Sequence, residues 1–164
     1  MKKSTKCLFA LLLMLGAMLE MKAADVYLLT AQTINGIVGK YEVPSNHQFA
    51  PNTSYGANVY SLKITSMPGT EFWFRIGVSG GGNQMQPKDN GDQLKINEEG
   101  TQDPISYSIE SGCYGNSNAW KVSYTAGEYE YLTVNVDITE GETVRRVWIE
   151  GKKTSAGGSG EPVV

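Results

Sequence analysis

The stretch from Gly127 to Glu150, GEYEYLTVNVDITEGETVRRVWIE, restricts the fold of this chain more than any other. Side chains of a β-strand point alternately to opposite faces, and the first half of this stretch alternates in that way. Its apolar face is made by Leu132, Val134, Val136 and Ile138. Glu140-Gly141 interrupts the pattern, and glycine supplies the positive φ that a short hairpin needs. The stretch therefore predicts a β-hairpin, and with it an all-β domain.

The first residues of the chain have the features of an export signal. Lys2, Lys3 and Lys6 precede an apolar run from Cys7 to Leu19, which is shorter than the ~20 residues that span a bilayer. Small residues at 23 and 24 follow, where cleavage is expected. We therefore predict a signal peptide over residues 1–23, the alternative being an uncleaved anchor. The mature chain is then exported to the periplasm, the outer surface or the medium, with no transmembrane span.

Charge and cysteine positions restrict the partners and the anchoring of the exported chain. Residues 1–23 hold four of the 14 lysines and arginines and one of the 17 acidic residues, so the rest carries a net charge of −6. Such a surface repels phosphate backbones, and we expect no nucleic-acid partner.

Cys7 precedes the apolar run, whereas a lipoprotein cysteine follows it, so the chain is not an obvious lipoprotein. Cleavage of the signal peptide would remove Cys7 and leave Cys113 as the only cysteine, which excludes an intramolecular disulfide.

Short alternating segments separated by turn residues continue along the chain. No segment after the signal has the 3.6-residue period of a helix, and we count about eight strands. Loops are predicted at Pro44–Gly56, Ser79–Gly91 and Asn97–Pro104. Apart from the hairpin, the predicted strands are Asp25–Thr30, Ile34–Val43, Asn58–Ser66, Thr70–Val78, Asp92–Ile96, Ile105–Glu110 and Ala119–Tyr124. This pattern predicts an antiparallel two-sheet β-sandwich, immunoglobulin-like or like a carbohydrate-binding module, over residues 25–151. Residues 152–164 are predicted to be a flexible, Gly/Ser-rich tail or linker.

The sequence gives little support to catalysis or to a cofactor. His47 is the only histidine, and in its polar loop we expect it to be exposed. Zinc needs three or four N or S ligands, and only His47 and Cys113 are offered. Gly80-Gly81-Gly82 is followed by no GK[ST] motif, so it is not a phosphate loop. The acidic loops match no calcium-loop spacing. A glycosidase needs two facing carboxylates, and the sequence singles out no such pair. We therefore expect a non-enzyme without cofactor or metal.

Aromatic residues suggest a binding surface instead. Trp73 and Arg75 are two apart on a predicted strand, so both project away from its phenylalanine face, and Tyr129 and Tyr131 likewise project away from the core face of theirs. A sugar stacks its apolar face on a ring and hydrogen-bonds to a guanidinium or an amide. These four residues are the predicted ligand-binding residues. The alternative is that the rings pack under loops, as buried tryptophans commonly do.

Three segments resemble a known family. They are DVYLLT (Asp25–Thr30), EFWFRIG (Glu71–Gly77) and GEYEYLTVNVDI (Gly127–Ile138), the last within a stretch that ends in TVRRVWI. In these places the chain is similar to SusE/SusF-like domains, which are surface glycan-binding β-sandwich modules of bacterial polysaccharide-utilisation systems. The resemblance covers Asp25 to Gly151. It implies a non-catalytic module at the outer membrane that binds an oligosaccharide or polysaccharide.

Three functions therefore remain open after the sequence alone. The first is an exported, non-catalytic glycan-binding module. The second is a structural or adhesive surface module that binds a protein partner, with an edge strand such as Ile105–Glu110 available for pairing. The third is an enzyme, which would need a deep cleft with converging carboxylates.

Overall fold

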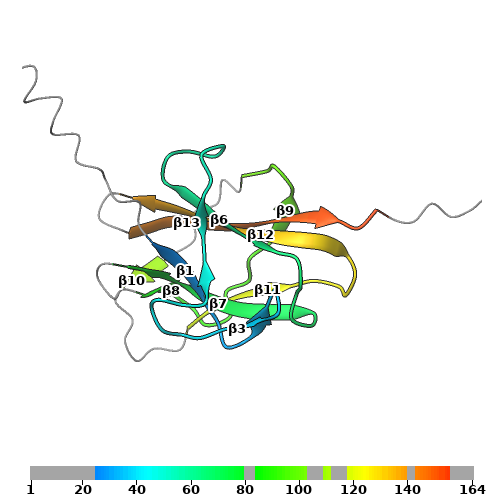
Figure 1. The fold of residues 1–164 in the computed structure, drawn as a ribbon, viewed down its shortest axis with the longest axis horizontal. Helices are drawn as coiled ribbons and strands as arrows, with labels where there is room; N and C mark the ends of the chain where they lie inside the picture. The colour runs from blue at the N-terminus through cyan, green and yellow to red at the C-terminus, as the bar shows by residue number, and fades with distance from the viewer. Residues whose placement is uncertain (1–24, 80–83, 103–108, 112–117, 140–142, 156–164) are drawn as a thin grey trace, which may run out of the picture.

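The computed structural model describes residues 25–79, 84–102, 109–111, 118–139 and 143–155. These residues form β-strands and no helix, which confirms the prediction of an all-β fold (Figure 1). All strand pairs but one are antiparallel. The predicted signal peptide, the Glu140-Gly141 turn and Cys113 lie outside the described residues. No helix in the described part is long and apolar enough to cross a membrane.

The first sheet is built around β7 (Glu71–Val78). Its strands follow the order β10-β8-β7-β1-β4, and β11 pairs with β7 over the residues that β8 does not reach. The other strands of this sheet are β1 (Val26–Leu29), β4 (His47–Gln48), β8 (Gln84–Pro87), β10 (Ile109–Ser111) and β11 (Trp120–Ser123). β7 therefore places its alternate residues at the centre of a sheet, with one row toward the core and one row outward.

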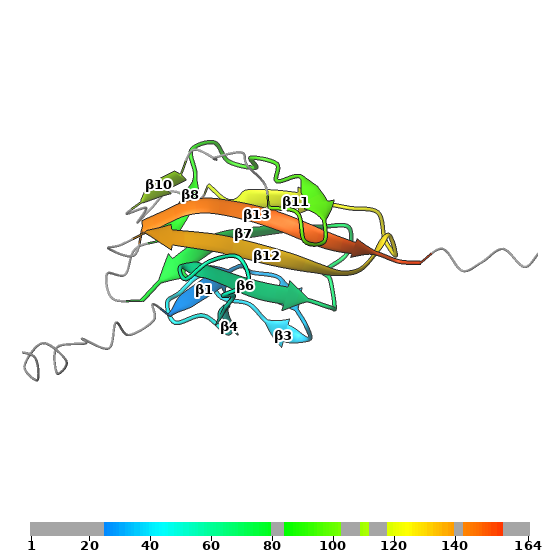
Figure 2. The same ribbon diagram turned by 90° about the horizontal axis from the view of Figure 1, so that it is seen from above.

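The second sheet is built around the predicted hairpin. β12 (Tyr129–Thr139) and β13 (Thr143–Lys153) run side by side along most of the molecule (Figure 2), with Val134 opposite Ile149. The sheet order is β5-β6-β12-β13-β9. The remaining strands are β5 (Ala50–Pro51), β6 (Val59–Ile64) and β9 (Ile96–Glu98), and β9 pairs in parallel with β13. A separate two-stranded sheet joins β2 (Thr33–Ile34) to β3 (Ile37–Val38).

The two larger sheets share one apolar core. Figure 1 shows β12 and β13 in one layer and β7, β8 and β11 in another. The predicted apolar faces point inward: Phe72 and Phe74 from β7, Trp120 from β11, and Leu132 and Val134 from β12 are all buried. The rings of Phe72 and Phe74 lie 5.5 Å apart, and those of Phe74 and Trp120 lie 5.7 Å apart. Trp120 is therefore a core residue.

Two polar side chains connect the β2–β3 region to the larger sheets. Gln32 continues the backbone pairing of β7 beyond the end of β1: its Nε2 donates to the carbonyl of Glu71 and its Oε1 accepts the amide of Trp73. Asn35 has a φ of 54°, a left-handed conformation that asparagine tolerates. Its Oδ1 accepts the amides of Thr65 and Ser66. Asn35 and Gly36 therefore form a turn inside the segment that was predicted to be one strand, Ile34–Val43, and Gln32 fixes the backbone at Trp73.

Several sequence predictions about loops and strand ends are wrong. The described residues contain thirteen strands, because β4, β5, β8 and part of β9 lie where loops were predicted, and because the predicted strand Ile34–Val43 is replaced by the two short strands β2 and β3. The strands in the predicted loops have two to four residues, too few to show an alternation. The Asp92–Ile96 prediction overlaps β9 at one residue only. β13 ends at Lys153, so the domain extends beyond Gly151 and the tail begins later than predicted.

His47 is also placed wrongly by the sequence. Its side chain is 3% exposed, because β4 pairs with β1 and turns the imidazole inward. The Nε2 atom lies 3.1 Å from the carbonyl oxygen of Ile34. The histidine is therefore a buried structural residue rather than an exposed loop residue.

Candidate functional site

The structure divides the four predicted ligand-binding residues between the two sheets. Trp73 and Arg75 lie on β7 of the first sheet, and Tyr129 and Tyr131 lie on β12 of the second. The register of β7 keeps Trp73 and Arg75 on the face opposite the buried phenylalanines, as predicted. The four residues do not form one continuous platform.

Trp73 is half-buried within a small polar cluster. Its Nε1 donates to Glu71 Oε1 at 3.1 Å, and Lys121 Nζ lies 5.3 Å from the ring centroid. Lys121 and Glu71 form an ion pair of 2.6 Å. Hydrogen bonds from Lys121 and from the Trp73 indole hold the pKa of the Glu71 carboxyl below its usual value. The outer edge of the indole packs on Gly91, where an added Cβ would lie 3.1 Å from the ring. The indole orientation is therefore fixed before any ligand arrives.

Arg75 is held beside a second ring on the same face. Its Nη1 donates to Gln84 Oε1 at 3.1 Å, and its Cζ lies 5.3 Å from the centroid of the Tyr41 ring. Gln84 Nε2 in turn donates to the backbone carbonyl of Tyr41. The ring of Tyr41 is exposed. The outer face of the first sheet thus presents two aromatic rings, with a guanidinium stacked beside the ring of Tyr41.

Tyr131 is on the outer face of the second sheet, and its ring is already covered. Lys63 Nζ lies 3.4 Å from the ring centroid, and the hydroxyl donates to a carboxylate oxygen of Glu99. The hydrogen bond to Glu99 and the partial burial raise the pKa of Tyr131. Tyr131 is therefore the least available of the four predicted residues.

Tyr129 does not project away from the core as the sequence predicted. The pairing of β12 with β13 shifts register between Tyr129 and Tyr131, so that Tyr129 lies opposite Lys153 and Tyr131 opposite Lys152. This irregularity turns the Tyr129 ring inward, where it packs against the edge of the core and against Gly151. The prediction assumed that side chains alternate between the two faces along the whole strand, which holds only where the pairing of the two strands is regular. At Tyr129 the pairing is irregular.

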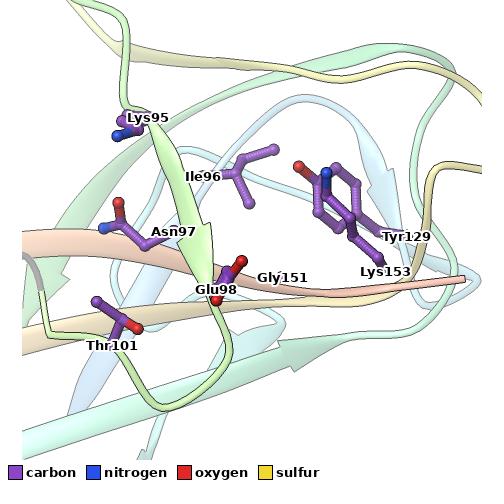
Figure 3. A pocket seen from close by; sticks show the side chains of 8 residues that line it. All are labelled: Lys95, Ile96, Asn97, Glu98, Thr101, Tyr129, Gly151 and Lys153. Atoms are coloured by element: carbon purple, nitrogen blue, oxygen red, sulfur yellow. The ribbon is translucent and has the colours of Figure 1, made fainter.

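A cavity of about 430 Å³ opens beside the Tyr129 ring. Figure 3 shows the ring on one side and Ile96 of β9 facing it. The described residues that line the cavity are Lys95, Ile96, Asn97, Glu98, Thr101, Tyr129, Gly151 and Lys153. Its size is in the range of small-molecule sites, which combine apolar walls with a few polar groups. The cavity therefore offers one aromatic wall, one aliphatic wall and a polar rim.

The charges of the cavity lie at its rim. Lys95, Lys153 and Glu98 are exposed, and only Glu98 among the described lining residues carries a carboxyl group. Lys153 Nζ is 3.9 Å from Glu128 Oε1, at the outer limit of an ion pair. Burial, followed by the hydrogen bond and charge of Glu128, raises the pKa of Tyr129. Tyr129 thus stays neutral at physiological pH.

Sequence reasoning missed every cavity residue except Tyr129. The cavity forms because β9 pairs in parallel with the end of β13, a contact between residues about fifty positions apart. Gly151 was interpreted only as the end of the domain. Its lack of a side chain is what lets the Tyr129 ring and Ile96 approach the backbone of β13. No local pattern of residues signals such a contact.

A buried carboxylate on the far side of β13 fixes the neighbouring loop. Glu150 is 4% exposed and accepts four hydrogen bonds. The donors are Trp148 Nε1 at 2.7 Å, Tyr55 Oη at 2.7 Å, the Gly100 amide at 2.9 Å and Asn135 Nδ2 at 3.2 Å. The Gly100 bond holds the turn that follows β9, next to Thr101 of the cavity. Trp148 is thus a buried structural residue.

Two tyrosines, the half-buried Tyr55 and the buried Tyr124, predict alkaline instability. Burial and the Glu150 carboxylate raise the pKa of Tyr55 to about 12, and burial with the charge of Glu71 raises that of Tyr124 to about 12. A tyrosine's ordinary pKa is 10.0, so the folded state holds these protons more tightly than the unfolded state does. The stabilisation is complete below about pH 10 and should be lost as the pH rises to about 12.

Denaturant unfolding at a series of pH values across this window measures the effect. The free energy of unfolding should fall steadily, and the double variant Tyr55→Phe, Tyr124→Phe should have a shallower slope. A wild-type stability that is constant to about pH 11.5 would contradict the assignment.

Comparison of the chain with protein-family models, with curated proteins and with solved structures found no match. The candidate site therefore rests on the geometry of this chain. In the described residues, no group of three or more histidine, cysteine, aspartate or glutamate side chains is placed to hold a metal ion.

Proposed function

We propose that this chain is an exported, non-catalytic β-sandwich module that binds an oligosaccharide or polysaccharide. The observation that carries the proposal is the cavity beside Tyr129. Its walls are a ring and an aliphatic side chain, Tyr129 and Ile96, and its rim includes Asn97 and Thr101. A sugar ring has apolar C–H faces and polar hydroxyl edges, so it matches an aromatic wall with a polar rim. Binding of this kind needs no cofactor and no bond breaking.

The Trp73–Arg75 surface is the proposed second contact for a longer glycan. Gly91, which packs on Trp73, is four residues before Lys95 of the cavity. Four residues span at most ~14 Å, so the two places are close enough for one oligosaccharide to reach both. Trp73 and the exposed ring of Tyr41 would contact further sugar units, with Arg75 as a hydrogen-bond donor between them. Tyr131 would contribute little, because Lys63 covers its ring.

Binding of the purified protein to a panel of soluble and insoluble polysaccharides tests the function. Depletion of the protein from solution by one class of polymer is the expected result. The variant Trp73→Ala should then bind about fivefold to tenfold more weakly to a long polymer, since loss of a stacking ring costs about 1–1.5 kcal/mol. Circular dichroism checks that this variant is folded.

Two results would count against parts of this proposal. If the folded protein binds no member of the panel, the glycan function is wrong. If Trp73→Ala unfolds the protein, Trp73 is a structural residue and the second contact is wrong, although the cavity is unaffected.

A protein-binding surface module is the second candidate function. The observation that favours it is the exposure of two neighbouring aliphatic residues on β3, Ile37 at 46% and Val38 at 66%. Neighbouring exposed apolar residues can contribute to a protein contact surface when they belong to a larger apolar patch. Of the predicted edge strand Ile105–Glu110, only its last two residues are described, and they lie in β10. Retention of a surface protein by the wild type but not by Val38→Ser would favour this candidate.

A further inference from the structure

The two lysines at the cavity rim are less tightly paired with carboxylates than three cations of the sheet strands. Lys121, Arg146 and Lys152 make ion pairs of 2.6, 3.1 and 3.2 Å with Glu71, Asp137 and Glu130. Lys95, by contrast, makes no ion pair in the described part of the chain, and Lys153 approaches Glu128 only to 3.9 Å. The cavity therefore has one cation without an ion pair among the described residues, Lys95, and one, Lys153, in a long ion pair with Glu128.

This local charge contrasts with the rest of the exported chain. The residues after the signal peptide carry a net charge of −6, so the surface as a whole repels anions. Among the described lining residues of the cavity, two ammonium groups face one carboxylate, that of Glu98, and the carboxylate of Glu128 lies 3.9 Å from Lys153. A positive site on a negative protein attracts an anion only at short range, because charges beyond about 10 Å are screened at ordinary salt concentrations. Any preference for anionic ligands would thus be decided within the cavity itself.

We propose that the cavity selects sugars that carry a carboxylate, such as uronic acids, over neutral sugars. This inference rests on the proposed glycan function and adds the ligand class. Tyr129 and Ile96 would take the apolar face of the sugar ring, and its carboxylate would lie at the rim next to Lys95 or Lys153. In Figure 3 these two lysines are at opposite sides of the cavity, so a carboxylate on either side of the sugar can reach one of them. Lysine suits this role, because its long flexible side chain carries a point charge with three donors.

A matched pair of ligands tests the charge directly. The probes are oligogalacturonate and its carboxyl-reduced form, which has the same linkages without the charge, together with the same pair made from a glucuronic acid polymer. We expect the acidic form of at least one pair to bind more tightly than its reduced form, with a difference that shrinks as salt is raised from about 0.01 to 0.5 M. Equal or tighter binding of the reduced forms would overturn the inference and leave the glycan function in place. If neither form of either pair binds while a neutral polymer does, the carboxylate preference is likewise overturned. If no polymer of any kind binds, the glycan function fails with it.

Three rim variants and one control locate the effect. Lys95→Gln and Lys153→Gln should each weaken binding of the acidic ligand roughly threefold to tenfold, the range of single charge-assisted contacts at exposed sites. Glu98→Gln should strengthen it, because a repulsive carboxylate is removed. Lys88→Gln, an exposed lysine outside the cavity, should have no effect. All four side chains are exposed, so the variants should fold. Equal effects of Lys88→Gln and Lys95→Gln would mean that net charge, and not the cavity, attracts the ligand.

Discussion

Replacing Glu150 by leucine should lower the free energy of unfolding by about 3–5 kcal/mol. The carboxylate accepts four hydrogen bonds, and two of its donors, Asn135 and Trp148, are 0% and 1% exposed. Without Glu150 these two donors remain buried and lose this acceptor, at a cost of about 1–3 kcal/mol each. The other donors, on Tyr55 and Gly100, lie nearer the surface and can turn to water. Chemical denaturation of the purified protein measures the loss.

Graded variants separate the network from a general effect of losing a charge. Glu130→Leu removes an exposed carboxylate paired with Lys152 in the same hairpin, and it should cost less than about 1 kcal/mol. Tyr55→Phe removes one of the four donors and should cost about 1 kcal/mol. If Glu150→Leu costs no more than Glu130→Leu, the buried carboxylate does not stabilise the fold. Because Gly100 is one of its partners, the Glu150 variant should also weaken ligand binding.

Replacing Gly151 by alanine should abolish ligand binding at the cavity. A Cβ at this position would lie 2.5 Å from Tyr129 Cδ1, 2.6 Å from its Cε1 and 2.8 Å from Ile96 Cγ2, all shorter than real contacts. Both walls of the cavity must therefore move to admit one methyl group. Overpacking of this kind typically costs about 1–3 kcal/mol of stability, which the domain can tolerate. We expect at least a tenfold loss of affinity, measured by titration calorimetry with the polymer that the wild type binds.

A destabilised variant of the first sheet shows whether that loss is local. Ile76→Val shortens a buried residue of the first sheet, away from the cavity residues, and should cost about 0.5–1.5 kcal/mol. It should bind as the wild type does. Tyr129→Phe keeps the ring and should retain most of the affinity, whereas Tyr129→Ala should not. Wild-type affinity in Gly151→Ala would show that the ligand binds elsewhere, and attention would move to Trp73 and Arg75.

The core of this protein was predictable from the sequence because it depends on alternation within long strands. Leu132, Val134, Val136 and Ile138 face inward in β12, and Phe72 and Phe74 face inward in β7, as their spacing indicated. The outward direction of Trp73 and Arg75 followed from the same period. These predictions needed only that a strand buries one face, because apolar residues at every second position indicate which face is buried.

The candidate site was less predictable, because it depends on contacts between distant segments. His47 is buried by the pairing of a two-residue strand with β1, and no alternation of its own marks that strand. Tyr129 was expected to point outward, but an irregularity in the β12–β13 ladder turned it toward Gly151. The lysines of the rim were ordinary polar residues in the sequence, and they acquire a shared position only through β9.

The sequence by itself thus determined the all-β fold and the inward face of each long strand, since the two-residue period of a strand is a local property of the chain. Only the tertiary structure decided the short strands, the four donors around Glu150 and the cavity beside Tyr129. Three of the four donors lie 15 to 95 positions from Glu150, and β9 lies about fifty positions from its partner β13. Their meeting depends on strand order and register rather than on any local pattern.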